Sequence, residues 1–304
     1  MVTFCSKEVS FMHKRRGLFF QSLVLTLLLV IPMMGMVVFF ASQRTEQQML
    51  KQAAAGQTRI SEPAGARNTH RILLAVQAEQ PAFLLLRLDG PEQAVIFCAL
   101  PGELVLQAPS GTTTLGDCYL TAGPARASEL LGDTLGIAPD AYLAATAGTF
   151  SFIWGEDADV RFDTAAVLNA EERKALDCAE ETVLELTPDQ GAEFLKQAAA
   201  LPEQQPAGMA KVRGALWAAF FRQNPRHLAG LAEGVRSASS QTLTDLRAQD
   251  LYDLEDTLTW LSTATGYHVD YQTLELSRAA GGWQLTADDL ELVQTLLEGG
   301  KRVE

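Results

Sequence analysis

Cysteine is scarce in this sequence, and the few that occur do not form a recognisable framework. Four cysteines are present among 304 residues, at positions 5, 98, 118 and 178, without a CxxC motif or a mixed Cys/His spacing. A zinc site or a disulfide-rich scaffold is therefore disfavoured. We expect Cys98, Cys118 and Cys178 to be small buried apolar side chains, with a Cys98–Cys118 bridge as the alternative.

Basic residues are also under-represented. Lysine and arginine number 24 against 37 aspartates and glutamates, which gives a formal net charge of −13. A surface of this sign repels nucleic acid and anionic lipid headgroups, so we predict no nucleic-acid partner. The sequence contains no G-x-S-x-G, HExxH or P-loop motif. It therefore does not support the classes of hydrolase and nucleotide-binding protein that these motifs identify.

Charge of either sign is absent from residues 18–41, LFFQSLVLTLLLVIPMMGMVVFFA. At about 1.5 Å per residue, a helix of this length exceeds the roughly 30 Å of bilayer hydrocarbon. A cleaved signal peptide is the alternative, but bulky Phe39 would occupy the position before the cut where a small residue is needed. We therefore predict one transmembrane helix, with the lipid bilayer as its partner.

The flanks of this segment predict its orientation. Lys7, Lys14, Arg15 and Arg16 precede it, opposed by Glu8 alone, whereas Arg44 is the only nearby charge of that sign beyond it. Positive flanks stay in the cytoplasm. We therefore expect a single-pass protein of the cell membrane, with a cytoplasmic tail (1–17), a transmembrane helix (18–41), a stalk or linker (42–70) and an extracytoplasmic domain (71–304).

Three short apolar runs begin the outer domain. RILLAVQA (71–78), AFLLLRLD (82–89) and AVIFCALP (94–101) are almost continuously apolar, which is typical of strands buried on both faces. The GPEQ sequence at 90–93 predicts a hairpin turn between the second and third runs.

Helical patterns dominate the remainder. ARASELLGDTLG (125–136) has helical leucine spacing and ends at Gly136, and residues 141–153 combine a strand with a short helix. Thr187 and Gln190 form a capping-box pattern, residues 209–224 have an apolar face, and Thr286 is a candidate N-cap. We predict an α/β fold: a layered α-β-α domain with a central sheet and a helix-rich C-terminal half, preceded by one transmembrane helix.

The order of these segments resembles that of the LytR-CpsA-Psr family of single-pass proteins with an extracytoplasmic α/β domain. The segment TLGDCYLTAGPARASELLGDTLGI (114–137) is similar to the family's KIN-x-AY-x-x-GG-P sequence with its LLGI helix, and LTPDQGAEFL is similar to L-x-G-x-QAL-x-YVR. The resemblance covers residues 71–262. It implies a role in cell-envelope (cell-wall) assembly, where the family transfers phosphoglycopolymers from a polyprenyl pyrophosphate carrier to peptidoglycan.

The residues that this chemistry requires are largely replaced. The family's G-x-D falls at Val76 and Ala78, and its SDT falls at residues 80–82, so both aspartates are missing. The S-I-P-R-D motif becomes residues 99–103, with Gly102 in place of the arginine and Glu103 in place of the aspartate. The lysine of KIN-x-AY falls at Thr114, the arginine of YVR falls at Lys196, and R-x-x-RQ is reduced to Ala210, Arg213 and Gly214. A leaving diphosphate requires nearby cations, so these losses disfavour catalysis.

Two hypotheses follow from the resemblance. The first is a non-catalytic homologue, a pseudoenzyme without a cofactor, that binds a polyprenyl-linked polymer, another envelope polymer or a cell-wall assembly protein. The alternative is an active phosphoglycopolymer transferase or pyrophosphatase acting on polyprenyl diphosphate-linked substrates with Mg²⁺. Its weak catalytic candidates are Glu103 and Arg213, its weak substrate-binding candidates are Arg87, Arg126 and Lys211, and it requires the cations to meet in one cleft.

Other polar groups are better read as structural. Two acidic clusters lack the ligand spacing of an EF-hand and are typical of exposed loops or helix faces. They are Glu156/Asp157/Asp159 and Asp250/Asp253/Glu255/Asp256. Asp117 suits a solvated position, and we expect structural roles for His227 and His268. The sequence therefore provides no confident metal site.

Overall fold

The computed structural model describes residues 65–109, 111–155, 157–199, 206–264 and 267–298. The predicted cytoplasmic tail, the span at 18–41 and the stalk up to residue 64 lie outside these ranges. No helix in the described ranges is both long enough and apolar enough to cross a membrane.

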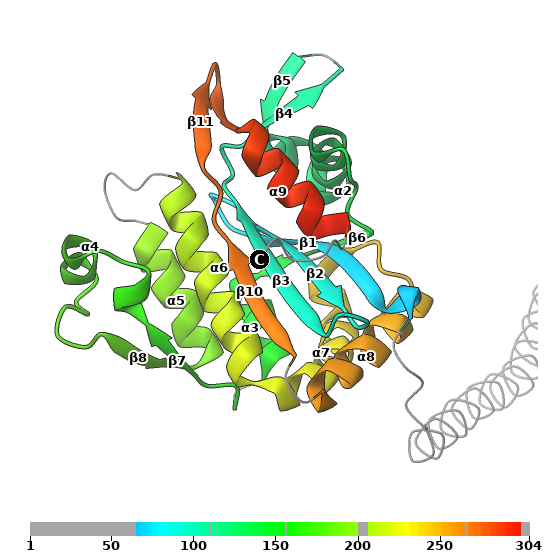
Figure 1. Ribbon diagram of the computed structural model, residues 1–304, viewed down its shortest axis with the longest axis vertical. Coiled ribbons are helices and arrows are strands. Elements are labelled where there is room, and N and C mark those ends of the chain that lie inside the picture. Colours follow the sequence, from blue (N-terminus) through cyan, green and yellow to red (C-terminus); the bar gives the residue numbers. More distant parts are fainter. Residues whose placement is uncertain (1–64, 110, 156, 200–205, 265–266, 299–304) are drawn as a thin grey trace, which may run out of the picture. The chain divides into compact units, whose positions relative to one another are not determined.

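The three apolar runs form the centre of the sheet, as predicted (Figure 1). Strand β1 (Thr69–Gln77) pairs antiparallel with β2 (Ala82–Asp89), which pairs antiparallel with β3 (Ala94–Leu100). The predicted hairpin turn is confirmed, because the amide of Gln93 donates to the carbonyl of Gly90 at 3.2 Å. Strand β1 begins two residues earlier than expected, so Thr69 and His70 belong to the sheet and not to the stalk.

Three further strands complete a six-stranded sheet of order β10-β3-β2-β1-β6-β9. Strand β6 (Ala141–Thr146) runs parallel to β1, and β10 (His268–Gln272) runs parallel to β3. Strand β9 (Thr242–Thr244) pairs antiparallel with β6. The carboxyl ends of β1, β3, β6 and β10 therefore meet at one side of the sheet, together with the beginning of β2.

Helices α2 (Leu115–Leu135) and α9 (Ala287–Glu298) cover one face of the sheet (Figure 1). Helix α2 ends at Gly136 in the left-handed conformation, as predicted, but it begins ten residues before the predicted start. The sequence pattern missed this first part because Gly123 has non-helical backbone angles and Pro124 follows it, so the two helical segments differ in direction.

Five helices cover the opposite face: α3 (Ala147–Trp154), α5 (Pro188–Ala199), α6 (Pro206–Gln223), α7 (Pro225–Ser237) and α8 (Ala248–Thr263). The capping box at α5 is confirmed, since Thr187 and Gln190 exchange hydrogen bonds of 2.9 and 3.3 Å between side chain and backbone. Thr286 caps α9 by accepting from the amide of Asp289 at 3.1 Å. The observed fold is thus α/β, with a central sheet between helices.

Smaller elements surround this framework. The hairpin of β4 (Val105–Ala108) and β5 (Gly111–Thr114) and the hairpin of β11 (Leu276–Ala279) and β12 (Gly282–Leu285) lie at the same end of the molecule in Figure 1. Strands β7 (Val160–Asp163) and β8 (Val183–Leu186) form a two-stranded antiparallel sheet, and the short helix α4 (Ala170–Ala175) lies between them in sequence.

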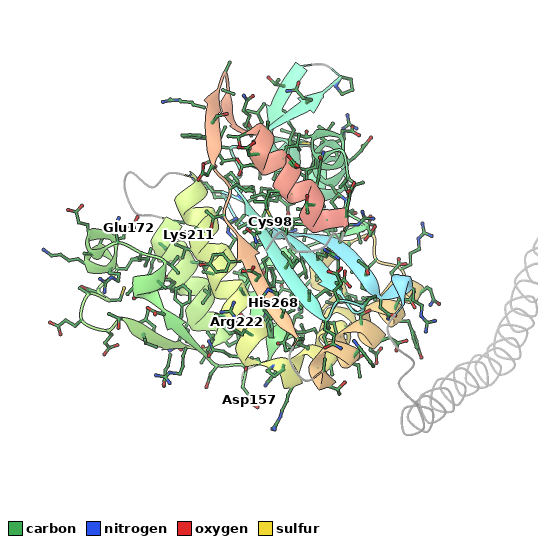
Figure 2. All side chains as sticks on the ribbon, viewed as in Figure 1. Cys98, Asp157, Glu172, Lys211, Arg222 and His268 are labelled. Atoms are coloured by element: carbon green, nitrogen blue, oxygen red, sulfur yellow. The ribbon has the colours of Figure 1, made fainter. Side chains whose placement is uncertain are left out.

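The three described cysteines are buried free thiols. Cys98 and Cys118 both pack in the core on the α2/α9 face without forming a disulfide, and Figure 2 marks Cys98 within the sheet. Burial raises the pKa of the Cys98 thiol to about 12, which keeps it protonated at neutral pH. These residues therefore behave as small apolar side chains, as predicted.

Candidate functional site

The site that the sequence predicts lies where the strands end. Gln77 closes β1, Leu100 closes β3, Thr146 closes β6 and Phe83 lies at the beginning of β2. We call these four positions the strand-end edge. Tyr119 of α2 faces it, and its ring meets the Phe83 ring edge-on at 5.5 Å. Loops at this side of a sheet with parallel strands commonly hold ligands, so this is the place to test the predicted chemistry.

Arg213 reaches the strand-end edge from α6. Its guanidinium donates from one nitrogen to the carbonyls of Phe83 at 2.8 Å and Leu100 at 3.1 Å. Burial lowers the pKa of Arg213 to about 10, an effect that the negative charge of Glu103 partly offsets. The side chain is still a cation at neutral pH, but it fastens the beginning of β2 to the end of β3.

Glu103 lies in the loop that follows β3, with an exposed side chain. Its backbone carbonyl accepts from the amide of Trp283 at 3.0 Å, which connects the β11–β12 hairpin to this loop. A Cβ atom added at Gly282 would lie 2.5 Å from the same carbonyl, so the close approach of the two chains requires glycine. The negative charge of Glu103 acts on the guanidinium of Arg213. Glu103 and Arg213 are thus the two catalytic candidates that the structure brings together.

The sequence resemblance predicts that Gly102 replaces the arginine of the family's S-I-P-R-D motif. The carbonyl of Gly102 accepts from the amide of Gly116 at 2.8 Å, and an added Cβ would lie 3.3 Å from the carbonyl oxygen of Pro81. The backbone at this point packs tightly against the first turn of α2. This part of the edge thus supplies no cation to an approaching diphosphate.

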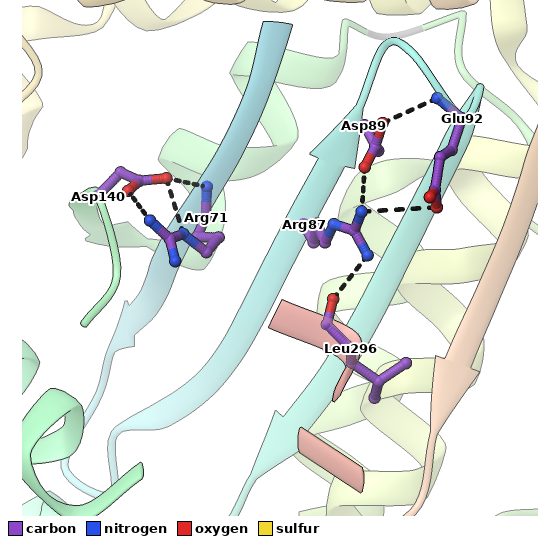
Figure 3. Close-up of polar contacts among 6 residues, drawn as sticks. All are labelled: Arg71, Arg87, Asp89, Glu92, Asp140 and Leu296. Atoms are coloured by element: carbon purple, nitrogen blue, oxygen red, sulfur yellow. Dashed lines mark hydrogen bonds and ion pairs between the residues drawn. The ribbon is translucent and has the colours of Figure 1, made fainter. Parts of the chain in front are cut away.

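Arg87, a candidate for substrate binding, lies far from Arg213. In β2 it is four residues beyond Phe83, which corresponds to roughly 13 Å along the strand, and it faces α9. Its guanidinium pairs with Asp89, lies 3.5 Å from the Glu92 carboxylate and donates to the carbonyl of Leu296 at 2.8 Å (Figure 3). Arg87 is thus part of a buried ion pair beneath α9.

The remaining cationic candidates also lie apart from one another. Arg126 is on α2, across the sheet from α6, and pairs with Glu129 at 2.6 Å. Lys211 is partly exposed on α6 (Figure 2), and residues two apart on a helix do not face each other, so it diverges from Arg213. Lys196, which the sequence resemblance matches to the arginine of YVR, is exposed and pairs with Glu193 at 3.3 Å. The structure does not gather these cations in one cleft.

The acidic candidates have structural partners. Asp250 belongs to the N-terminal capping box of α8, and Glu255 pairs with Arg236 of α7. Asp117 lies in the first turn of α2, where its amide donates to Thr114. Within the described residues, no three histidine, cysteine, aspartate or glutamate side chains are grouped so that they could hold a metal ion.

The histidines named by the sequence belong to the framework. The amide of His227 donates to the carbonyl of Asn224 at 3.0 Å at the beginning of α7, and the amide of His268 donates to Gln93 at 2.7 Å where β10 begins (Figure 2). His268 also lies 3.8 Å from Asp270. Neither histidine belongs to the strand-end edge.

Aromatic side chains fill the interface between the sheet and α3 and α6. The Phe97 ring lies 5.0 Å from that of Phe221, and the Trp154 ring lies 4.9 Å from the same Phe221 ring. Phe150 and Trp217 meet at 5.4 Å. On the other face, a cavity of about 10 Å³ lies between β2, β3 and α9, far below the roughly 300–1,000 Å³ of a typical ligand pocket.

Two of the contacts described above were not predicted from the sequence. Asp89 was not recognised as the partner of Arg87, although residues two apart on a strand point to the same face. The contact between the Tyr119 and Phe83 rings was also missed, because no local pattern relates α2 to the beginning of β2.

The fold defined by this sheet and its two helix layers is that of the LytR-CpsA-Psr proteins, so the predicted resemblance is confirmed at the level of the fold. B. subtilis TagT is similar to this chain over 79% of its length and 94% of TagT, with 13% identity and a TM-score of 0.57. TagT bound to LIIa-WTA gives a TM-score of 0.59 over 93% of that structure. A protein from Eubacterium siraeum DSM 15702, described as a transcription regulator, gives a TM-score of 0.63 at 15% identity, covering 80% of this chain and 96% of that one.

No protein-family model and no curated protein sequence matches the chain. At 13–15% identity, these three solved structures establish a common fold and do not establish the activity of this chain.

Replacing Arg213 with methionine is expected to lower the free energy of unfolding by about 1–3 kcal/mol, because the carbonyls of Phe83 and Leu100 lose their charged donor. Urea denaturation at neutral pH measures this change. Lys211→Met on the same helix is the matched control, with an expected change within about 0.5 kcal/mol. Equal effects of the two substitutions would show that the Arg213 contacts do not stabilise the sheet.

Proposed function

We propose that this chain is a membrane-anchored, extracytoplasmic protein of cell-envelope assembly, with the LytR-CpsA-Psr fold but without the family's transferase chemistry. Its domain acts by binding an envelope polymer or a cell-wall assembly protein. The fold supports the kinship, and the bound polymer named in the TagT complex supports a polymer as ligand. The uncharged segment 18–41 and its basic flank support the location in the cell membrane.

One observation carries the non-catalytic part of the proposal. At the strand-end edge, the one arginine that matches the family's pattern, Arg213, donates to two backbone carbonyls and lies near the negative charge of Glu103. Gly102 supplies no side chain where the family has a second arginine. A diphosphate needs several cations as its negative charge develops, and a site that has lost one such donor typically loses about 3 kcal/mol of transition-state stabilisation.

The filled interior supports the same conclusion. A polyprenyl chain requires an apolar tunnel, whereas ring-to-ring contacts among Phe97, Trp154 and Phe221 occupy the interface between the sheet and α3 and α6. Opening such an interface would forfeit close-packed contacts. The domain is therefore suited to binding at its surface.

The alternative, an active transferase with displaced residues, requires Arg87, Arg126, Lys211 and Arg213 to converge. Arg87 forms an ion pair with Asp89 beneath α9, and Arg126 lies on the opposite face of the sheet from Arg213. These positions favour the non-catalytic proposal.

The decisive experiment uses the full-length protein in detergent micelles with Mg²⁺ and a polyprenyl diphosphate-linked glycopolymer. We expect no release of polymer or phosphate above the rate without protein, and retention of glycopolymer in a parallel binding measurement. An active LytR-CpsA-Psr transferase is the positive control.

Turnover that disappears in Glu103→Ala, with the protein still folded, would overturn the non-catalytic proposal. Failure to retain the glycopolymer would instead direct the search to a protein partner.

A further inference from the structure

The two edge strands of the six-stranded sheet, β10 and β9, differ in what their outer backbone groups contact. In β10, Val269 and Tyr271 face away from β3, because the amide of His268 donates towards β3 and alternate residues face opposite sides. The guanidinium of Arg222 donates to the carbonyl of Val269 at 2.9 Å, and the amide of Tyr271 donates to the Asp270 carboxylate at 2.8 Å. Side chains thus occupy part of this edge, which hinders pairing with a further strand.

The hydrogen bonds between β6 and β9 show which groups of β9 face outward. Both backbone groups of Tyr142 in β6 face β9: its amide donates to the Asp245 carboxylate at 2.8 Å, and its carbonyl accepts from the Thr244 hydroxyl at 2.5 Å. Because backbone groups alternate sides along a strand, Ala144 also faces β9, where it pairs with Leu243. The backbone groups of Leu243 therefore face β6, and those of its two neighbours face away from the sheet.

These neighbours, Thr242 and Thr244, leave the outer edge of β9 open. Among the residues that the structure describes, none forms a hydrogen bond with their two amides and two carbonyls. The side chain of Leu243 between them is 53% exposed, and it lies on the α2/α9 face because it is opposite Ala144, which packs in that core. Open backbone groups beside an exposed apolar side chain are suited to pairing with another strand.

The charge distribution favours a second copy of this chain as the source of that strand. Each chain carries a formal charge of −13, so two copies repel each other over most of their surfaces. Residues 238–244, ASSQTLT, contain β9 and are uncharged. In an antiparallel pair centred on Leu243, Thr242 lies opposite the partner's Thr244 and Gln241 lies opposite the partner's Asp245. No like charges therefore meet across the two strands.

We propose that two copies associate by antiparallel pairing of β9 with β9 about a two-fold axis, which joins their six-stranded sheets into one. Thr242 and Thr244 of each copy exchange backbone hydrogen bonds with the other. The two Leu243 side chains face each other as a non-hydrogen-bonded pair, with Cα atoms about 4.5 Å apart. An interface this short is weak in dilute solution and is strengthened where membrane anchors concentrate the chains. That last consequence rests on the proposed membrane location, whereas the pairing itself does not.

Sedimentation equilibrium of the full-length protein in detergent micelles tests the association. We expect a monomer–dimer equilibrium in the wild type and a dissociation constant raised about tenfold or more in Leu243→Lys, because two cations then meet at the axis. Leu120→Lys is the matched control: Leu120 on α2 is 58% exposed, and the same change of charge there should leave the dissociation constant unchanged.

Cysteine cross-linking tests the geometry of the pair. In a Cys5→Ser background the remaining cysteines are buried, and Leu243→Cys places two thiols at a Cα separation within the roughly 4.4–6.8 Å that a disulfide spans. Mild oxidation is expected to give a covalent dimer for Leu243→Cys and none for Leu120→Cys.

Three results would overturn the proposal. They are a wild type that is monomeric at every concentration, a dimer that Leu243→Lys does not weaken, and equal cross-linking of Leu243→Cys and Leu120→Cys. None of these measurements involves a glycopolymer, so the β9 pairing and the proposed function can fail separately.

Discussion

Arg87→Ala is expected to lower the free energy of unfolding by about 3–5 kcal/mol. The substitution leaves the Asp89 carboxylate buried without its cation, since both side chains are only 4% exposed, and it removes the donor to the carbonyl of Leu296. That carbonyl lies in the last turn of α9, where a cation also interacts favourably with the helix dipole. Urea denaturation at neutral pH measures the change.

Arg71→Ala provides a matched control within the same sheet. Arg71 forms a bidentate pair with Asp140, but these side chains are 30% and 42% exposed, so we expect a loss of only about 0–1 kcal/mol (Figure 3). The double variant Arg87→Met/Asp89→Leu should recover much of the stability that Arg87→Ala loses, because it removes the stranded charge. If Arg87→Ala and Arg71→Ala are equally mild, the Arg87 pair does not hold α9 to the sheet.

Phe97→Ala is expected to cost about 3–5 kcal/mol of stability. Phe97 is fully buried on β3, and its ring contacts those of Trp217 and Phe221 at centroid distances of 6.4 and 5.0 Å. Truncation would leave a cavity between the sheet and α6 that the rigid strand and helix cannot close. The midpoint of urea denaturation should fall with little change in the slope.

Phe152→Ala on α3 is the matched control, because the Phe152 side chain is 61% exposed. Its loss should change stability by no more than about 0.5 kcal/mol. A small effect of Phe97→Ala would mean that the interface repacks easily, and it would weaken the argument that aromatic side chains exclude a polyprenyl chain.

Local patterns predicted the elements whose residues depend on their immediate neighbours. The continuous apolar runs of β1, β2 and β3 predicted strands buried on both faces, because only a sheet covered by helices accommodates such runs. Thr187 and Gln190 predicted the beginning of α5, since a cap is a contact between residues three apart.

Elements that depend on distant partners were not predicted from the sequence. Strand β10 contains His268 and Asp270 and has no strong apolar pattern, yet it extends the sheet by pairing with β3. The start of α2 was missed because Gly123 and Pro124 interrupt a helix that tertiary packing continues. In both cases, contacts across the fold override weak local preferences.

Which side chains are present at the candidate site follows from the amino-acid sequence alone. The motif resemblance predicts the loss of two aspartates and the replacement of an arginine by Gly102, and the uncharged segment 18–41 is visible in the sequence. The contacts of the remaining cations depend on the fold. Arg87 became half of a buried ion pair, and Arg213 became a donor to two strands, because buried charges and backbone carbonyls must be satisfied by whatever the fold places beside them.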